Sequence, residues 1–462
     1  MRTKFLSFIV FLVVLNVANA QSIQDLMDQV NTANLETMIK ELSGEEVALI
    51  NGTNQTITNR IHSNNDLATT YIQEHLEALP NLNVEIQNFN STGKNVIATQ
   101  LGTTNPQNIY IICAHYDSVT TYCADDNATG VAAVIEIARI LSTQCIDNTI
   151  IYALWDEEEI GLLGANYYAQ QAADETGGNT RDNILAVVNM DMIGYDGDAL
   201  GTAGDNDFDI DVRNIANSLT IKDELLNILN TYTFDLNPIV VDPGTTASDH
   251  SRFWNQGYSA VLVGESWETN DQTPDYHTSN DRSEDIDLPY MTELTKLVLA
   301  YTATEVNLIA IDNTVTENTT SLVSNESSGS YQWYNCDTES SINGATSQTF
   351  TPTTDGNYAV EVSNGSCTEI SNCVSFTVLS IEEFTSNELR IYPNPVTSIL
   401  KIENYLEANL RITINDISGK EINIINSSLP NINVDFSSLP KGVYFINFIS
   451  ETKSSSYKIV KE

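Results

Sequence analysis

About the first two thirds of the chain alternate short, continuously apolar runs with segments of helical spacing. Residues 109–114 (Ile-Tyr-Ile-Ile-Cys-Ala) are apolar throughout and too short for a stable helix, which is the pattern of a strand buried on both faces. The same pattern recurs at residues 150–155, 184–190 and 259–264. In residues 131–141 the apolar positions recur at helical spacing. Strands interleaved with helices predict a three-layer α/β/α domain around a mixed sheet.

The pattern changes after residue 311. Residues 313–330 are rich in Asn, Thr and Ser and poor in apolar side chains, which predicts a linker. Beyond it, apolar and polar residues alternate with a period of two, and turn-forming residues separate the runs. We therefore expect an α/β domain over residues 21–312, followed by two small all-β sandwiches over residues 331–380 and 381–462.

The N-terminal residues have the pattern of a secretory signal peptide. Arg2 and Lys4 precede an apolar run over residues 5–17, and an Ala-Asn-Ala sequence ending at residue 20 offers a cleavage site. No later apolar run is long enough to span a membrane. We expect residues 1–20 to be removed and the mature chain to leave the cytosol.

The chain is strongly acidic, with 20 basic against 62 acidic residues and a formal net charge of −42. A field of this sign repels nucleic acid and anionic lipid, so both are excluded as partners. A charge of this size otherwise favours solubility outside the cell.

The chain contains six cysteines, which could form disulfides in an oxidising compartment. Cys113 lies within a predicted core strand, where a buried thiol is expected. Cys123 and Cys145 flank a loop and its helix, so a bridge between them is possible. The cysteines whose pairing the spacing leaves open are Cys336, Cys367 and Cys373.

Imidazole and carboxylate side chains follow the predicted core strands. His115 follows the first strand and Asp191 the third, while Glu158 and Glu159 follow the second. In open α/β sheets, ligands bind at the carboxyl ends of the strands. Two imidazoles, counting His277, together with several carboxylates and no thiolate suit zinc.

This inventory matches a site for two zinc ions. Two metal ions about 3.5–4 Å apart need a shared carboxylate and further ligands on each side. Asp125, in the loop after the first strand, is the expected shared ligand. His115 and Asp191 would then bind one ion, and Glu159 and His277 the other.

Glu158 remains as the expected general base, which would take a proton from zinc-bound water and pass it to the leaving group. Asp117 could accept the second ring N–H of His115. Each choice has a plainer alternative. The acidic run 156–159 could be a solvated surface, and His250 is as easily structural as supporting. The joint occurrence of these groups at successive strand ends favours a metal site.

Six segments carry a family resemblance: His115-Tyr-Asp117, residues 124–130, residues 158–164, residues 189–194, Ser248-Asp-His250 and Tyr276-His277. Together they resemble the di-zinc family of bacterial leucyl aminopeptidases, which is related to glutamate carboxypeptidase and glutaminyl cyclase. The similarity covers most of residues 22–312 and implies a zinc exopeptidase fold.

The resemblance also implies roles for individual residues. Asp125 would be the bridging ligand, Glu158 the general acid/base and Glu159 a ligand. Tyr276 matches a tyrosine that helps to hold the tetrahedral oxyanion in some members. A cis peptide bond follows the bridging aspartate in this family, which places it here between Asp125 and Asp126.

Three consecutive glutamates leave two possible registers. The position of Gly161 makes Glu158 and Glu159 the matching pair, rather than Glu157 and Glu158. Glutaminyl cyclases resemble this fold but work with one zinc ion, and the presence of His115 favours the two-metal peptidase.

The last unit, from Tyr392-Pro-Asn-Pro395 to Glu462, resembles the C-terminal sorting domain of the type IX secretion system of Gram-negative bacteria. Residues 330–379 are similar to Ig-like modules. These resemblances imply passage through the periplasm and across the outer membrane, with the type IX secretion machinery as a partner.

The sequence thus predicts a secreted zinc aminopeptidase that trims the N-termini of peptides and proteins. The alternatives are a carboxypeptidase-like or glutaminyl cyclase-like relative, or an adhesin with an inactive peptidase-like domain. A carboxypeptidase needs cations for the terminal carboxylate, and only Arg252 and Arg282 lie near the motifs, which favours a free amine. The presence of every expected ligand argues against the adhesin.

Overall fold

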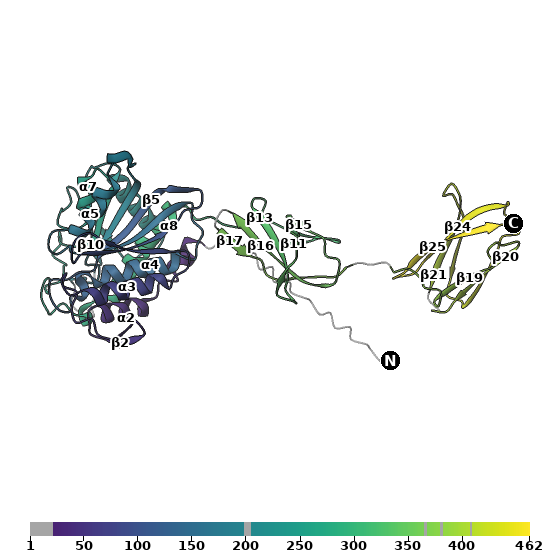
Figure 1. The fold of residues 1–462 in the computed structure, drawn as a ribbon, viewed down its shortest axis with the longest axis horizontal. Coiled ribbons are helices and arrows are strands. Elements are labelled where there is room, and N and C mark those ends of the chain that lie inside the picture. The colour runs from purple at the N-terminus through teal and green to yellow at the C-terminus, as the bar shows by residue number, and fades with distance from the viewer. Residues whose placement is uncertain (1–21, 198–204, 365–366, 379–381, 407–408) are drawn as a thin grey trace, which may run out of the picture.

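The computed structural model describes residues 22–197, 205–364, 367–378, 382–406 and 409–462. Figure 1 shows three bodies in succession: a large α/β domain, a β domain beside it, and a second β domain at the far end. The predicted signal peptide, residues 1–20, lies outside the described residues. None of the helices in the described ranges combines the length and apolar composition that spanning a membrane requires.

The α/β domain is built on an eight-stranded mixed sheet with the order β3-β4-β6-β5-β7-β10-β8-β9. The strands are β3 (Asn83–Asn88), β4 (Lys94–Gln100), β5 (Asn105–His115), β6 (Asn148–Trp155), β7 (Asn183–Met190), β8 (Asp207–Asp211), β9 (Asn237–Val241) and β10 (Ala260–Glu265). The central strands β6, β5, β7 and β10 are parallel to one another, whereas β3, β4 and β8 pair antiparallel with their inner neighbours. The four strands predicted from continuous apolar runs are these central ones.

Helices cover both faces of the sheet, as predicted. The first layer comprises α1 (Ile23–Met27), α2 (Thr32–Leu42), α3 (Asp66–Glu77), α4 (Gly130–Leu141), α6 (Ser218–Thr231) and α8 (Leu288–Glu305). The second layer comprises α5 (Leu163–Ala172) and α7 (His250–Asn255). Along β5, Ile112 packs with the first layer, while Ile111 and Cys113 pack with the second. A strand buried on both faces has no place for a polar residue, which explains its continuous apolar run.

The first β domain contains two small sheets. One has β11 (Val315–Glu317), β12 (Leu322–Ser324) and β15 (Thr349–Phe350), and the other has β13 (Ser330–Asn335), β14 (Ser340–Ser341), β16 (Gly356–Asn364), β17 (Cys367–Ile370) and β18 (Val374–Phe376). The prediction of a linker over residues 313–330 is therefore wrong, because β11 and β12 belong to this domain. Leu322 is fully buried in its core.

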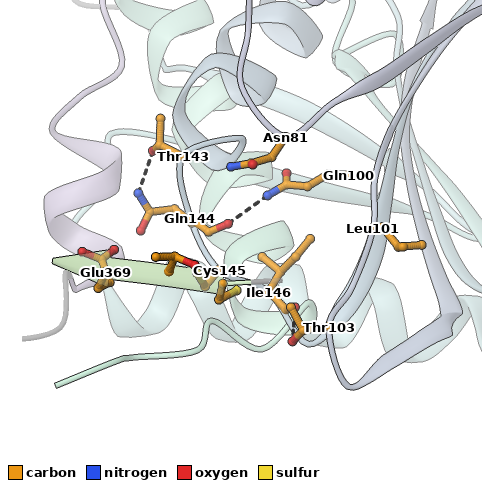
Figure 2. A pocket seen from close by; sticks show the side chains of 11 residues that line it. Asn81, Gln100, Leu101, Thr103, Thr143, Gln144, Cys145, Ile146 and Glu369 are labelled. Atoms are coloured by element: carbon orange, nitrogen blue, oxygen red, sulfur yellow. Dashed lines mark hydrogen bonds between the residues drawn. The ribbon is translucent and has the colours of Figure 1, made fainter. Parts of the chain in front are cut away.

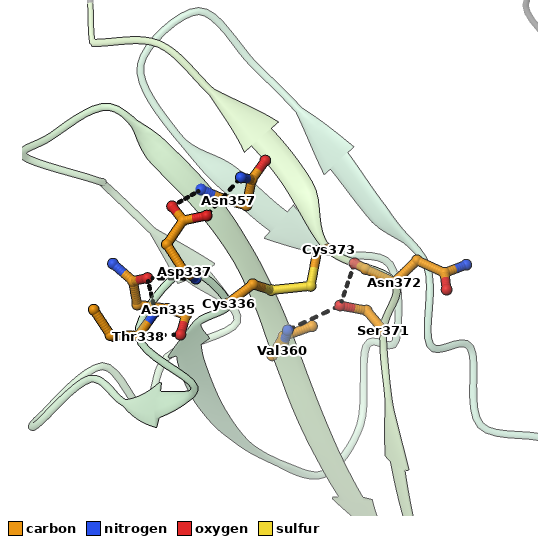
Figure 3. The surroundings of a disulfide bond; sticks show 9 residues. All are labelled: Asn335, Cys336, Asp337, Thr338, Asn357, Val360, Ser371, Asn372 and Cys373. Atoms are coloured by element: carbon orange, nitrogen blue, oxygen red, sulfur yellow. Dashed lines mark hydrogen bonds between the residues drawn. A yellow bond between two sulfur atoms is a disulfide. The ribbon is translucent and has the colours of Figure 1, made fainter.

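This β domain contacts the α/β domain through β17, and residues of both domains line a cavity at the junction (Figure 2). Cys336 and Cys373 form a disulfide within the β domain (Figure 3). Cys123 and Cys145 are both free, so the bridge considered between them is not formed. Cys113 is a buried free thiol, as expected.

The C-terminal domain is a sandwich of two antiparallel sheets. The first holds β19 (Leu389–Tyr392), β20 (Ile399–Asn404) and β23 (Asn431–Asp435), and the second holds β21 (Leu410–Asp416), β22 (Glu421–Ser427), β24 (Gly442–Ile449) and β25 (Ser454–Lys461). Inward-facing side chains of both sheets form one hydrophobic core. The C-terminal domain thus has a hydrophobic core of its own.

Candidate metal centre

Three neighbouring parallel strands deliver side chains to one edge of the sheet. His115 is the last residue of β5, and Asp191 immediately follows β7. Glu158 and Glu159 lie on the turn that follows β6. The His115 Nε2 atom is 3.1 Å from Asp191 Oδ1. The four residues that the sequence places after core strands therefore lie close together in the structure.

The second histidine comes from the loop after β10. The His277 Nε2 atom lies 3.1 Å from Glu159 Oε2 and 3.3 Å from Asp126 Oδ2. The other carboxylate oxygen of the same aspartate, Asp126 Oδ1, is 3.3 Å from His115 Nε2. Asp126 therefore presents one oxygen to each imidazole.

This geometry corrects the assignment of Asp125 as the shared ligand. The Asp125 Oδ1 atom accepts hydrogen bonds from the backbone N–H of Gly194 at 2.9 Å and from the Thr129 hydroxyl at 3.2 Å. The cis peptide bond lies between Asp126 and Asn127, one residue later than expected. Two consecutive aspartates offer two registers, and the backbone of the loop turns the second of them toward the histidines.

Asp281, which the sequence reasoning missed, fixes this loop. Its two carboxylate oxygens accept the backbone N–H groups of Asp125 at 2.7 Å and of Asp126 at 3.0 Å. Asp281 lies in the same loop after β10 as His277 and belongs to no motif in the sequence. Only the spatial closeness of the loop could have identified it.

Asp117 has the orienting position expected for it. Its Oδ1 atom is 3.5 Å from the Nδ1 atom of His115 and accepts the backbone N–H of Glu158 at 3.0 Å. Its Oδ2 atom accepts the N–H of Glu159 at 3.2 Å. One carboxylate thus contacts the histidine of one strand end and the glutamate turn of the next.

The register of the three glutamates follows from their contacts. Glu157 accepts hydrogen bonds from Asn90 Nδ2 at 2.5 Å and from the Thr92 hydroxyl at 2.7 Å, outside the cluster of ligand atoms. Glu158 is grouped with His115 and Asp191, and burial raises the pKa of its carboxyl group well above the usual value.

The donor atoms of the cluster fit a divalent metal. Two groups, His115-Asp126-Glu159 and His115-Glu158-Asp191, each hold their potential ligand atoms within 4.8 Å of one another. Glu159 Oε1 is buried and has no hydrogen-bond partner. Burying a carboxylate is costly unless a cation or a donor satisfies it, and imidazole with carboxylate is a typical zinc ligand set.

Two further residues proposed from the sequence lie at or near this cluster. The ring of Tyr276 stacks on that of His277, with 3.7 Å between the centroids, and also contacts Trp267. His250 is structural: it is fully buried, its Nε2 atom lies 3.1 Å from the carbonyl oxygen of Thr245, and burial lowers its pKa to about 3. Its neighbour Asp249, part of the same sequence motif but given no role there, is also fully buried.

The residues of the metal cluster line a small cavity. A larger cavity of about 510 Å³ adjoins it. The residues that line both are Asp191, Met192, Ala247 and Tyr276. The larger cavity has apolar walls that include Val241 and Leu262, and carboxylates from Asp209, Asp211 and Glu268. No lysine, arginine or histidine is among the described residues that line it. Its electrostatic environment therefore favours a cation.

Residues 95–302 match the model of Peptidase family M28, and residues 390–462 match the secretion system C-terminal sorting domain. A probable zinc metalloprotease of Pyricularia oryzae is 37% identical over 122 residues, which is 24% of this chain and 23% of that protein. An aminopeptidase of Pseudomonas aeruginosa is 39% identical over 114 residues, covering 22% of this chain and 20% of that protein. The matches thus span less than a quarter of these two relatives.

Among solved structures, LapB from Legionella pneumophila is similar in fold. The TM-score is 0.52 at 20% sequence identity, and the match covers 63% of this chain and 77% of that chain. The matched region of each family model lies within a domain that has its own core: the α/β domain and the C-terminal sandwich. The α/β domain of this chain therefore resembles Peptidase family M28, and the last β domain resembles the secretion system C-terminal sorting domain.

Proposed function

We propose that this chain is a zinc-dependent aminopeptidase that hydrolyses N-terminal residues from peptides. The observation that carries the proposal is the position of Asp126 between His115 and His277, with Glu159 and Asp191 beside the two histidines. The relatives named as an aminopeptidase and as a zinc metalloprotease support this activity.

The cluster would hold two zinc ions. His115 and Asp191 would bind one and His277 and Glu159 the other, with Asp126 shared between them. When bound, zinc acts as a Lewis acid toward the scissile carbonyl and makes the attacking water more acidic. Removal of the metal should therefore abolish hydrolysis.

Glu158 would move the proton. Its carboxylate lies beside the ligand atoms of His115 and Asp191. The ligand shared by the two ions would be Asp126, so Glu158 is not required for that role. Burial raises its pKa, which suits a carboxyl group that accepts a proton from water and then gives it to the leaving amine. The hydrogen bond from its backbone N–H to Asp117 holds the turn that carries it.

Tyr276 would donate a hydrogen bond to the oxygen that becomes negatively charged at the scissile carbonyl. Burial and then the nearby carboxylates raise the pKa of its hydroxyl above the usual value, which favours the protonated form that can donate. Its ring stacks on His277 and also lines the larger cavity, so it lies where the metal cluster meets the substrate side chain.

The larger cavity would receive the side chain of the N-terminal residue. Its apolar walls suit an aliphatic stem, and the carboxylates of Asp211 and Glu268 suit a positively charged end. The Asp209 carboxylate accepts hydrogen bonds from the Ser266 hydroxyl at 2.7 Å and from the Trp267 N–H at 2.9 Å. The Asp211 carboxylate accepts one backbone N–H, from Thr245. An N-terminal lysine or arginine would therefore be the preferred substrate residue.

Export would depend on two segments outside the peptidase domain. Residues 1–20 would direct the chain to the periplasm, and the sorting domain would engage the type IX secretion machinery for passage across the outer membrane. The protein would then act on peptide N-termini outside the cell or at its surface.

Hydrolysis of aminoacyl arylamides by purified protein tests this function directly. We expect release of the arylamine from a lysyl or leucyl substrate, loss of activity with a chelator, and recovery with zinc. No release from an N-terminally acetylated substrate is expected, since the enzyme needs a free amine. Cleavage of the acetylated substrate, or formation of pyroglutamate from an N-terminal glutamine without arylamide hydrolysis, would contradict the proposal.

A further inference from the structure

Two free cysteines meet at the junction between the α/β domain and the first β domain. Cys145 lies between α4 and β6 of the peptidase domain, and Cys367 is the first residue of β17. Both line the cavity at this junction, in which Figure 2 labels Cys145. They lie far apart in the sequence, so their closeness depends on the docking of the two domains.

The contacts around the two cysteines are reciprocal. The two thiols interact directly with each other. In addition, the Cys145 sulfur accepts from the backbone N–H of Thr368, and the Cys367 sulfur accepts from the backbone N–H of Ile146. Each sulfur therefore lies against the residue that follows the other cysteine.

The chain that connects the two domains contacts the same segment. The backbone N–H of Ile309 donates to the carbonyl oxygen of Cys145 at 2.8 Å, and Leu308 forms a β-bridge with Ile146. The segment with Cys145 thus contacts both the connection and β17.

The same β domain already contains the disulfide between Cys336 and Cys373 (Figure 3). Disulfides persist in oxidising compartments, so this bond indicates that the domain matures where further thiols can be oxidised. The other two free thiols, Cys113 and Cys123, are buried within the peptidase domain.

We propose that Cys145 and Cys367 form a second disulfide, which covalently joins the α/β domain to the first β domain. The bond would keep β17 against the peptidase domain after export. It would also limit the freedom of the connection near residue 309, which would otherwise be the only covalent tie between the two domains.

The oxidant would be a protein disulfide of the thiol–disulfide oxidoreductase class. One cysteine thiolate attacks a sulfur of that disulfide and forms a mixed disulfide, releasing one oxidant thiolate. The second cysteine then attacks the sulfur of the first, the new bond closes, and the oxidant leaves as a dithiol. The oxidant gains two electrons, and the two cysteines lose two protons. Burial, followed by the neighbouring Cys367, raises the pKa of Cys145 to about 12, so the docked thiols should oxidise slowly in air.

Peptide mapping of full-length protein, purified after export in an oxidising compartment, tests the bond. Free thiols are alkylated in denaturant, and the protein is cleaved without reduction by a glutamate-specific protease. The four relevant cysteines then fall on separate peptides: residues 137–157, 327–339, 362–369 and 370–382. We expect peptide 137–157 linked to 362–369, and expect reduction to release both.

The link between peptides 327–339 and 370–382 serves as an internal control, because the Cys336–Cys373 disulfide should survive in the same sample. Recovery of Cys145 and Cys367 as alkylated thiols, with that control link intact, would overturn the proposal. So would a link from either cysteine to a different partner.

Single serine variants provide a second test. In Cys145→Ser, Cys367 should become fully alkylatable, and Cys367→Ser should free Cys145, while the Cys336–Cys373 link remains. In the double variant, a protease should cut the connection near residue 309 at least about tenfold faster than in wild type, since local opening is no longer restrained. Equal cleavage rates would show that the two domains are not tied by this bond.

Discussion

The sharpest test of the metal centre compares two adjacent aspartates that differ only in orientation. We predict that Asp126→Asn loses zinc, whereas Asp125→Asn retains it. Asp126 presents an oxygen to each of His115 and His277, at 3.3 Å in both cases. An amide at this position offers one neutral oxygen in place of two charged ones. It therefore cannot serve as a charged ligand shared by both zinc ions.

The expected magnitudes follow from these contacts. Loss of a group that merely orients a zinc ligand typically lowers metal affinity about 10–100-fold, so loss of a shared ligand should lower it at least about 100-fold. At Asp125 the amide oxygen can still accept the N–H of Gly194, and burial with the nearby Asp281 already raises the pKa of that carboxyl group. A neutral amide is therefore a close substitute, and we expect a cost in the free energy of unfolding of at most about 1 kcal/mol.

The assay is the zinc content of each variant after gel filtration into metal-free buffer, with affinity measured by competition against a chromophoric chelator. Thermal unfolding in excess zinc serves as the control for folding. Wild-type protein and Asp125→Asn should keep close to two zinc ions per chain, and Asp126→Asn at most one. Full zinc in Asp126→Asn together with loss in Asp125→Asn would refute the orientation of this loop.

Three further predictions concern the reaction and the domains. Glu158→Gln should keep its zinc but lose about 10²–10⁴-fold in kcat, because only proton transfer is removed. Glu157→Gln is the matched control and should retain nearly the wild-type rate; a dead, zinc-replete Glu157→Gln would move the catalytic register by one residue. Asp211→Asn should lower kcat/KM for a lysyl arylamide about tenfold relative to a leucyl one, or ~1.4 kcal/mol. Burial raises the pKa of Asp211 to about 6, so in the wild type this preference should grow as the pH rises through about 6 and the carboxylate gains its charge; a flat ratio would exclude Asp211 from specificity. A chain without residues 313–462 should hydrolyse small substrates within about twofold of the full-length rate, since the peptidase domain has its own core. A folded, zinc-loaded truncation that is inactive would mean that the β domains shape the substrate cleft.

The sequence predicted the central strands because burial on both faces requires continuous apolar residues. It missed β8, whose Asp-Phe-Asp-Ile-Asp sequence has polar residues at alternate positions yet is buried throughout. The carboxylate of Asp209 is tolerated there because the Ser266 hydroxyl and the Trp267 N–H satisfy it. The pattern of apolar residues cannot reveal a buried carboxylate whose donors come from a distant turn.

The β strands within residues 313–330 were missed for the opposite reason. Each has three residues, and Leu322 is the principal apolar side chain that the segment buries. Such short strands need few apolar residues, because backbone hydrogen bonds and one buried side chain hold them in the sheet. A polar composition therefore did not distinguish them from a linker.

The orientation of the Asp125–Asp126 loop depends on two groups of opposite charge that no motif contains. The Asp281 carboxylate holds the loop by its backbone N–H groups. From the other side, the buried Arg60 guanidinium donates to the carbonyl oxygens of Tyr116 at 2.9 Å and Cys123 at 2.6 Å. A carboxylate can only accept hydrogen bonds and a guanidinium can only donate them. Asp281 therefore binds backbone N–H groups of this region and Arg60 binds backbone carbonyl groups. The metal ligands lie at strand ends, where the sequence can identify them, but the choice between adjacent aspartates is made by residues that bind only the backbone.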